Sequence, residues 1–293
     1  MGNLFRSLQM ALEARKRRLP EHIRILSDED WLDLLIKSIS SPNIDGVEFP
    51  GFPSPELQVR FVGSDYENAL KEAFVFYTFL KQQAENLNVP LQRKCRFLDF
   101  GCGWGRFLRF FWKDIDVNRL FGCDVNSLIL DVCRNTQVPG NLSLISPDGR
   151  LPYRDKYFDF IIAYSVFTHL SEKLNLHWMR EIARVAKPGC IFSLTIEPRR
   201  FIEFIANIPP DTASEWYRLL SQYADQSSAM YEKYDAGDIV YLPTCGDDIG
   251  RTYGDAIVPL SFIQREWSPF FTVHSHIDDP EHFWQTVLLL QRK

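Results

Sequence analysis

An acid and three glycines stand together in one short run of the chain. Asp99 is followed by glycines at alternate positions, namely Gly101, Gly103 and Gly105. Glycine lets a backbone bend sharply where a Cβ would collide with a ligand. Apolar residues predict a buried strand over 97–100, and helical spacing predicts a helix from 106. Free N–H groups at a helix start attract anionic groups, so the run predicts a turn that holds a ligand.

A second acid lies where a βαβ unit would use one. Asp124 ends a short apolar run that predicts a strand, roughly 20 residues beyond Gly105. An acid at this distance reaches the ribose hydroxyls of a bound nucleotide. A carboxylate suits this task because it accepts hydrogen bonds from two neighbouring hydroxyls. The alternative is an ordinary loop acid or helix cap.

The glycine spacing differs from the dinucleotide fingerprint. The pattern is G-x-G-x-G, with Asp99 two residues before it, rather than G-x-G-x-x-G. It resembles the Rossmann-like (class I) S-adenosylmethionine-dependent methyltransferases. The resemblance implies that the turn passes under the methionine moiety of the cofactor and that Asp99 orders the loop and bonds the ligand, often its amine. The further cofactor contacts implied by the resemblance are Gly101, Cys102, Gly103, Arg106, Asp124 and Val125.

A third block strengthens this resemblance. A loop over 147–153 precedes a Phe-Asp pair, an apolar strand over 160–163 and the run Ser-Val-Phe-Thr-His-Leu-Ser. This order is similar to a bacterial methyltransferase subgroup that often modifies sugars, lipids or other small metabolites. The resemblance implies that the loop flanks the adenine and that the strand end faces the cofactor or the methyl acceptor. The residues concerned are Asp148, Gly149 and Leu151 in the loop, and Tyr164 and Ser165 at the strand end.

Arg60 lies in the segment 55–63, which resembles an element that closes over the cofactor edge in the same subgroup. Its guanidinium is a candidate to meet the cofactor carboxylate or an acidic acceptor. An exposed arginine without such a role is the open alternative.

Two residues are candidates for catalysis. Methyl transfer from a sulfonium is an in-line displacement, so positioning of the acceptor supplies much of the rate. A hydroxyl acceptor also loses a proton, and a histidine titrates near the operating pH. His169 is therefore the leading candidate for a base, with bracing of its loop as the alternative role. Glu197, at the end of the predicted fifth strand, is the second candidate to contact the acceptor or the base.

The implied fold is α/β, with a doubly wound, mostly parallel seven-stranded Rossmann-like sheet and helices on both faces. A helix over 175–187 is expected to stop at Pro188-Gly189, before a strand over 190–196. Asp211 is expected to cap a helix running from Thr212 toward Tyr231. The predicted organisation is an N-terminal helical arm (1–50), a cofactor-binding core (51–198), a helical cap insertion (199–255) and C-terminal strands that complete the sheet (256–293).

Composition favours an ordinary globular enzyme. The 293 residues are 45% hydrophobic and carry a net charge of −5, which gives no support to nonspecific nucleic-acid binding. The basic run 15–18 is expected to be a solvated helix face. The six cysteines are scattered without metal-ligand spacing, so no metal site is expected. Neither a span of ~18 apolar residues nor a signal peptide is recognised, and a cytoplasmic location is expected.

Alternatives to a methyltransferase remain at this point. A nicotinamide-dependent oxidoreductase shares the strand, turn and ribose acid, but it calls for G-x-G-x-x-G and a hydride-transfer site. A noncatalytic subunit of the same fold that scaffolds a partner is also compatible with the motifs. The expected acceptor is a small molecule, a sugar or a lipid. Nucleic-acid methylation is disfavoured because no Asn/Asp-Pro-Pro-Tyr/Phe tetrapeptide follows the fourth strand.

Overall fold

The protein is described by a computed structural model over residues 18–209, 211–212, 214–244 and 253–293. The first residues of the predicted arm (1–17) and part of the predicted cap (210, 213 and 245–252) lie outside this description. The chain divides into two compact units, the first of Met1–Ile145 with Phe158–Phe160, and the second of Ser146–Tyr157 with Ile161–Lys293.

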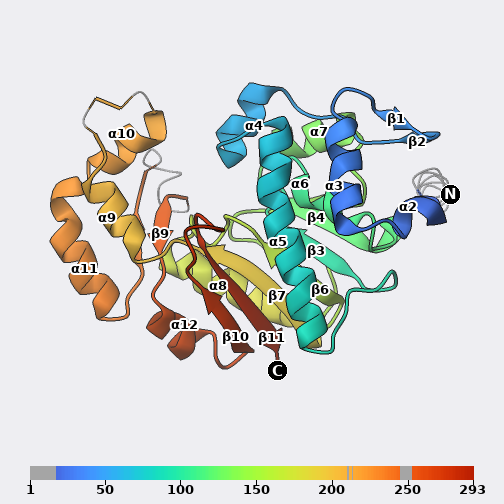
Figure 1. The fold of residues 1–293 in the computed structure, drawn as a ribbon. Helices are drawn as coiled ribbons and strands as arrows, with labels where there is room; N and C mark the ends of the chain where they lie inside the picture. Colours follow the sequence, from blue (N-terminus) through green and yellow to red (C-terminus); the bar gives the residue numbers. More distant parts are fainter. Residues whose placement is uncertain (1–17, 210, 213, 245–252) are drawn as a thin grey trace. The chain divides into compact units, whose positions relative to one another are not determined.

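The central sheet has seven strands in the order β10-β11-β7-β6-β3-β4-β5. It confirms the predicted α/β class with a mostly parallel sheet. The first unit carries α2 (Glu21–Arg24), α3 (Asp28–Lys37), β1 (Asn43–Ile44), β2 (Val47–Glu48), α4 (Pro55–Val62), α5 (Tyr66–Asn86), β3 (Phe97–Phe100), α6 (Arg106–Phe111), the 3-10 turn η1 (Val117–Arg119), β4 (Leu120–Asp124), α7 (Ser127–Asn135) and β5 (Asn141–Leu144) (Figure 1).

Strand β6 (Phe158–Ala163) is shared by the two units. The second unit then carries α8 (Glu172–Val185), β7 (Ala186–Ile196), α9 (Arg200–Ala206), α10 (Glu215–Ser221), η2 (Ala224–Gln226), α11 (Ser227–Asp235), β8 (Val240–Leu242), β9 (Asp255–Ile257), α12 (Leu260–Glu266), β10 (Phe271–Ile277) and β11 (Thr286–Arg292).

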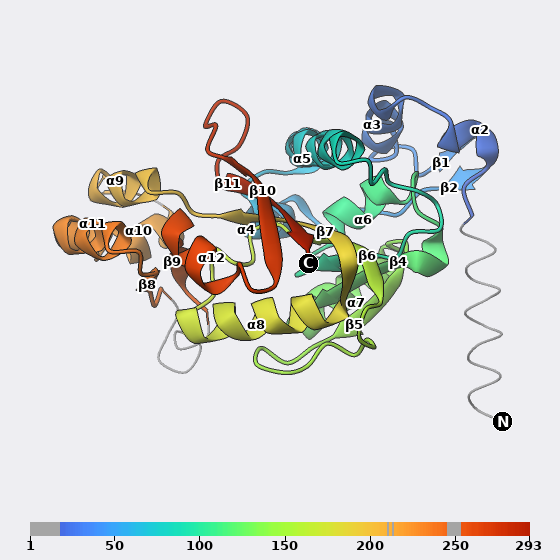
Figure 2. The same cartoon turned by 90° about the horizontal axis from the view of Figure 1, so that it is seen from below.

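In the first unit, β3 pairs in parallel with β4, and β4 with β5. Helix α5 buries one apolar side at helical spacing, including Leu70, Phe76, Tyr77 and Leu80. It lies beside α3 and α6 (Figure 2). Every residue of β3 is buried, as a strand in the middle of a parallel sheet requires. Asp99 therefore lies in a buried strand, and the glycine turn begins where this strand ends.

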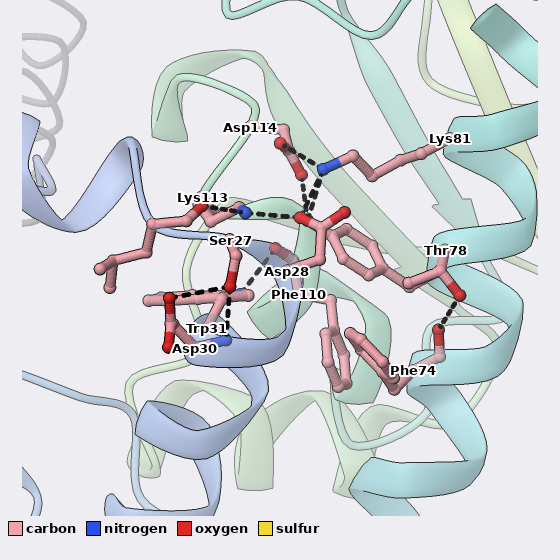
Figure 3. A network of polar contacts seen from close by, with 12 residues as sticks. Ser27, Asp28, Asp30, Trp31, Phe74, Thr78, Lys81, Phe110, Lys113 and Asp114 are labelled. Atoms are coloured by element: carbon pink, nitrogen blue, oxygen red, sulfur yellow. Dashed lines mark hydrogen bonds and ion pairs between the residues drawn. The ribbon is translucent and has the colours of Figure 1, made fainter.

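A polar network fixes the helices of this unit to one another (Figure 3). Asp28, the first residue of α3, accepts hydrogen bonds from Lys81 of α5 at 2.6 Å and from Lys113, just after α6, at 2.5 Å. Lys81 also bonds Asp114 at 3.1 Å. Burial raises the pKa of Asp28, but the bonds from Lys113 and Lys81 outweigh it and leave the pKa below its usual value. The charged form of Asp28 is thus part of the folded structure.

In the second unit, β11 pairs antiparallel with both β7 and β10. Strands at the C-terminus complete the sheet, as the sequence predicts. The predicted end of α8 was wrong: the helix stops at Val185, and Pro188 and Gly189 belong to β7. A residue before proline disfavours the α conformation, so the chain is already extended when it reaches Pro188.

The segment between β7 and β9 folds around its own apolar cluster, which includes Phe201, Leu220 and Met230. Helix α9 packs against α10 and α11 (Figure 1). The predicted single helix after Asp211 was wrong. Ser214 is the N-cap of α10, its Oγ accepting from Tyr217 N at 3.3 Å, and the chain turns through η2 before α11 begins. Among the described residues, no helix is long and apolar enough to cross a membrane.

We expect Asp28→Asn to lower the free energy of unfolding by about 2–3 kcal/mol, because it leaves the ammonium of Lys113, whose side chain is 4% exposed, without its charged partner. Urea denaturation measures this. Asp33→Asn, an exposed position of the same helix, is the control and should change stability by less than about 0.5 kcal/mol. Equal stability of the two variants would show that the network contributes little.

Candidate functional site

The glycine turn after β3 has the conformation that the sequence predicts. Gly103 and Gly105 have φ of 50° and 78°, a backbone region that residues other than glycine rarely adopt. A Cβ on Gly105 would lie 2.4 Å from Val138, whereas one on Gly103 would meet only a Phe61 ring atom, at 3.7 Å. The turn is therefore closed on the protein side at Gly105 and open at Gly103, where a ligand can approach the backbone.

Asp124 joins this turn to the end of β4. Its Oδ2 accepts from Gly103 N at 2.9 Å, and its Oδ1 accepts from Asn126 N at 2.9 Å. Asn126 in turn caps α7 by accepting from Leu128 N at 3.0 Å. Asp124 is 9% exposed, and Val125 beside it is 48% exposed. Burial raises the pKa of Asp124, against the backbone bonds that lower it.

Asp99 is buried beneath the turn with one unsatisfied oxygen. The residue is 1% exposed, and within the described part of the chain its Oδ2 has no hydrogen-bond partner. Burial raises the pKa of Asp99 to about 8; the nearby Asp124 carboxylate adds to this shift and Arg106 opposes it. A buried acceptor of this kind is costly unless a donor reaches it. A ligand ammonium group would satisfy it.

The other predicted residues of this unit take different positions. Cys102 is buried in the turn, and its N–H donates to Cys123 O at 3.0 Å. Arg106 is 4% exposed and donates to Ala69 O of α5 at 3.1 Å, which ties α6 to α5. Arg60 is exposed on α4. The turn and the two acids thus form the polar centre of this part of the site.

In the second unit, the loop with Asp148, Gly149 and Leu151 is fixed to α8. His177 Nε2 lies 2.7 Å from Gly149 O, and Leu151 N donates to Glu181 at 2.9 Å. Asp148 is exposed, whereas Leu151 is buried. The loop is held by its backbone, which leaves the Asp148 carboxylate at the surface.

A chain of polar groups connects the ends of β6, β7 and β11. Gln285 Nε2 donates to Ser165 Oγ and to Glu197 Oε1, both at 3.0 Å. Ser165 follows Tyr164, which is half-buried, and has φ of 55°. Its N–H donates to Thr195 Oγ1 at 2.7 Å. The sequence analysis did not identify Gln285, since nothing in its local pattern indicates contact with a residue 120 positions away.

Glu197 is 3% exposed, and its Oε2 is unsatisfied among the described residues. Burial raises its pKa to about 8; the bond from Gln285 opposes the shift, and the Asp255 carboxylate adds to it. The Glu197 carboxyl group therefore titrates near neutral pH, a property that acids and bases of active sites share.

His169 is oriented by β9 and the residues before it. Its Nδ1 lies 2.8 Å from Gly254 O and 3.8 Å from Asp255 Oδ1, and its ring stacks on Tyr253 with centroids 4.6 Å apart. A carbonyl oxygen accepts only, so Nδ1 carries the proton and Nε2 is left as the acceptor in the neutral ring. Asp255 is 2% exposed and accepts from Thr244 Oγ1 at 2.6 Å. The sequence analysis missed the role of Asp255, because only the fold brings it to His169.

Comparison with known families identifies the class. Residues 98–194 match the methyltransferase domain family. A crystal structure of an S-adenosylmethionine-dependent methyltransferase from Clostridium acetobutylicum has the same fold, with a TM-score of 0.50 at 11% identity over 74% of this chain and 91% of that one. Residues 98–194 therefore form a methyltransferase domain, and the fold is that of a SAM-dependent methyltransferase, as predicted. The nicotinamide-dependent alternative is not supported.

Two curated relatives share part of their length with this chain. The tRNA (carboxymethyluridine(34)-5-O)-methyltransferase of Arabidopsis thaliana is 28% identical over 173 residues, 58% of this chain and 40% of that one. The probable tRNA methyltransferase 9B of Bos taurus is 34% identical over 157 residues, 50% of this chain and 32% of that one. The chain thus spans less than half the length of either relative.

The raised pKa of Asp99 predicts a pH dependence of stability. An unfolded carboxyl group with a pKa near 3.8 binds its proton more weakly than Asp99 does in the fold. The stability due to that proton is complete below about pH 4 and is lost as the pH rises through about 8. We expect the free energy of unfolding to fall by a few kcal/mol between about pH 5 and about pH 9, with Glu197 contributing in the same direction.

Urea denaturation across this pH range tests the assignment. Asp99→Asn cannot lose a proton, so its stability should fall less steeply than that of the unmodified protein. Asp131→Asn, whose side chain is 61% exposed, is the control and should keep the full slope. An unchanged slope in Asp99→Asn would contradict a protonated Asp99.

Proposed function

We propose that this protein transfers a methyl group from S-adenosylmethionine to a hydroxyl-bearing small molecule, sugar or lipid. The observation that carries the proposal is the glycine turn with Asp124 bonded to Gly103 N and Asp99 buried beneath it. Open space at Gly103 and an unsatisfied carboxyl oxygen on Asp99 are what a cofactor with a ribose and an ammonium group requires.

The roles of the residues follow from this assignment. Asp124 accepts the ribose hydroxyls with the lone pairs that its two backbone bonds leave free. Asp99 receives the amine, and the N–H groups of the turn support the methionine moiety.

The adenosine and the acceptor have further contacts in this proposal. The adenosine is flanked by Asp148, Gly149, Leu151 and Val125. The cofactor or the acceptor is faced by Tyr164 and Ser165. Arg60 is exposed and available to a carboxylate, and Arg106 holds α6 in place.

When bound, the cofactor supplies an electrophilic methyl group on a sulfonium that leaves as a neutral thioether. The protein orients the acceptor and takes its proton. His169 Nε2 accepts the hydroxyl proton as the oxygen–carbon bond forms, and the Asp255 carboxylate, 3.8 Å from Nδ1, stabilises the resulting imidazolium. Glu197 and Gln285 position the acceptor through their connected side chains. The helices between β7 and β9 serve as the cap that limits access to the acceptor. The proposed organisation is an N-terminal arm (1–50), a cofactor-binding core (51–198), this cap (199–255) and C-terminal strands (256–293).

A second candidate acceptor is tRNA, because the curated relatives are named tRNA methyltransferases. The likeness covers the methyltransferase domain, which does not by itself determine the acceptor. The net charge of −5 favours an acceptor without a phosphate backbone. We retain the small-molecule acceptor and a cytoplasmic location as the proposal. Labelled methyl transfer to oligosaccharides, nucleotide sugars, lipids and total tRNA decides between the acceptors, and binding of the cofactor without transfer to any of them would indicate a noncatalytic scaffold.

We expect Asp124→Ala to weaken binding of S-adenosylhomocysteine roughly tenfold or more, because hydrogen bonds from the ribose to a charged acceptor are lost. Isothermal titration calorimetry measures the affinity. Asp131→Ala, an exposed acid on neighbouring α7, should bind as the unmodified protein does. Thermal denaturation shows whether the variants are folded. Equal affinity in a folded Asp124→Ala protein would remove Asp124 from the cofactor site.

His169→Ala should reduce turnover roughly a hundredfold or more, since a positioned general base contributes about that much, while affinity for S-adenosylhomocysteine stays unchanged. Asp255→Asn should reduce turnover less and alter its pH profile, as expected of a positioning residue. His274→Ala, an exposed histidine on β10, is the matched control. Full turnover of His169→Ala on the identified acceptor would assign His169 to bracing its loop.

A further inference from the structure

Four aromatic side chains of the second unit form a cluster that we call the aromatic platform: Phe204, Trp216, Tyr217 and Trp284. The ring of Phe204 lies 5.3 Å from those of Tyr217 and Trp284 and 6.3 Å from that of Trp216, measured between centroids. Trp284 is 50% exposed and Trp216 is 36% exposed. Large aromatic faces that gather at a surface mark binding sites more often than scattered apolar residues do.

Trp284 of the platform is linked to α9 by Arg200. Arg200 of α9 covers Trp284, with its guanidinium carbon 5.9 Å from the ring centroid. The same guanidinium donates from Nε to Asp278 at 3.0 Å and from Nη2 to Trp284 O at 2.5 Å. Arg200 thus ties the backbone of Trp284 to α9.

The platform borders a shallow hollow of about 330 Å³, within the size range of ligand sites. Its lining is largely apolar and includes two exposed polar side chains, that of Glu203 in α9 and that of Asn207, which follows this helix. Asn207 Nδ2 donates to Glu203 O at 2.8 Å. The hollow therefore offers a mostly apolar surface, with the Glu203 carboxylate as a hydrogen-bond acceptor among its lining residues.

We infer that the aromatic platform binds a pyranose ring of a neutral saccharide. The C–H bonds on the face of a sugar ring carry partial positive charge and pack on the negative face of an indole, while the hydroxyls at its edge bond polar side chains. The charged groups that line the hollow favour a neutral ligand over a nucleic acid. The Glu203 carboxylate would repel phosphate, and Arg200 is already paired with Asp278.

The platform is continuous with the residues proposed for catalysis. Trp216 Nε1 donates to Asp255 at 3.2 Å, and Asp255 also lies 3.8 Å from His169 Nδ1. Trp284 directly precedes Gln285, whose amide bonds Ser165 and Glu197. Because Trp216 contacts Asp255 directly, the inference places the saccharide on the platform as a neighbouring unit of the acceptor itself. This inference rests on the proposed function and narrows its acceptor to a sugar chain.

Tryptophan fluorescence titration tests the inference with four probes: maltohexaose, mannohexaose, galactohexaose and chitohexaose. We expect at least one to bind, Trp284→Ala to weaken it roughly tenfold or more, and Trp284→Phe, which keeps a flat ring, to restore most of the affinity. Calorimetry measures the saccharide affinity of the variants independently of Trp284 fluorescence. Tyr157→Ala removes another aromatic ring covered by an arginine, Arg154 at 5.2 Å, and should leave saccharide binding unchanged.

Titration of S-adenosylhomocysteine into the same samples separates the two claims. If it binds in all variants and no saccharide binds, the platform inference is overturned and the proposed function stands. If it does not bind to the unmodified protein, the proposed function fails. Binding of tRNA that Trp284→Ala abolishes, without saccharide binding, would assign the platform to RNA and contradict the inference.

Discussion

The proposed cofactor site depends on the carboxylate of Asp124. It accepts backbone N–H groups from the glycine turn after β3 and from the loop that begins α7, both at 2.9 Å. The turn needs glycine to adopt its conformation, and the carboxylate needs these donors to be stable at the edge of the core. One side chain thus sets the positions of two loops, which makes the backbone around Gly103 a preformed surface for a ligand.

In the second unit, loops and strand ends are also linked by side chains, which here come from residues distant in sequence. Gln285 links Ser165 with Glu197, and Asp255 lies between Trp216 and His169. Glu197 is buried beside Asp255, and this position raises its pKa. The groups proposed for proton transfer and those proposed for acceptor binding share neighbours. Trp216 of the aromatic platform therefore contacts Asp255, the neighbour of His169, directly.

The sequence predicted the parts of the fold that local pattern determines. The strand, turn and helix from β3 to α6 follow from apolar runs and glycine spacing, and Asp124 follows from its distance along a βαβ unit. The end of α8 was placed too far along the chain, because the effect of Pro188 begins before the proline itself. Gln285 and Asp255 were not identified as site residues, since tertiary contacts alone bring them to Ser165 and His169.

The crystal structure of the protein with S-adenosylhomocysteine is the most direct test of the cofactor assignment. The account predicts that the ribose hydroxyls bond the Asp124 carboxylate, that the amine lies within hydrogen-bond distance of Asp99, and that the chain of the ligand passes over Gly103. A ligand bound elsewhere, with Asp99 still unsatisfied, would contradict it.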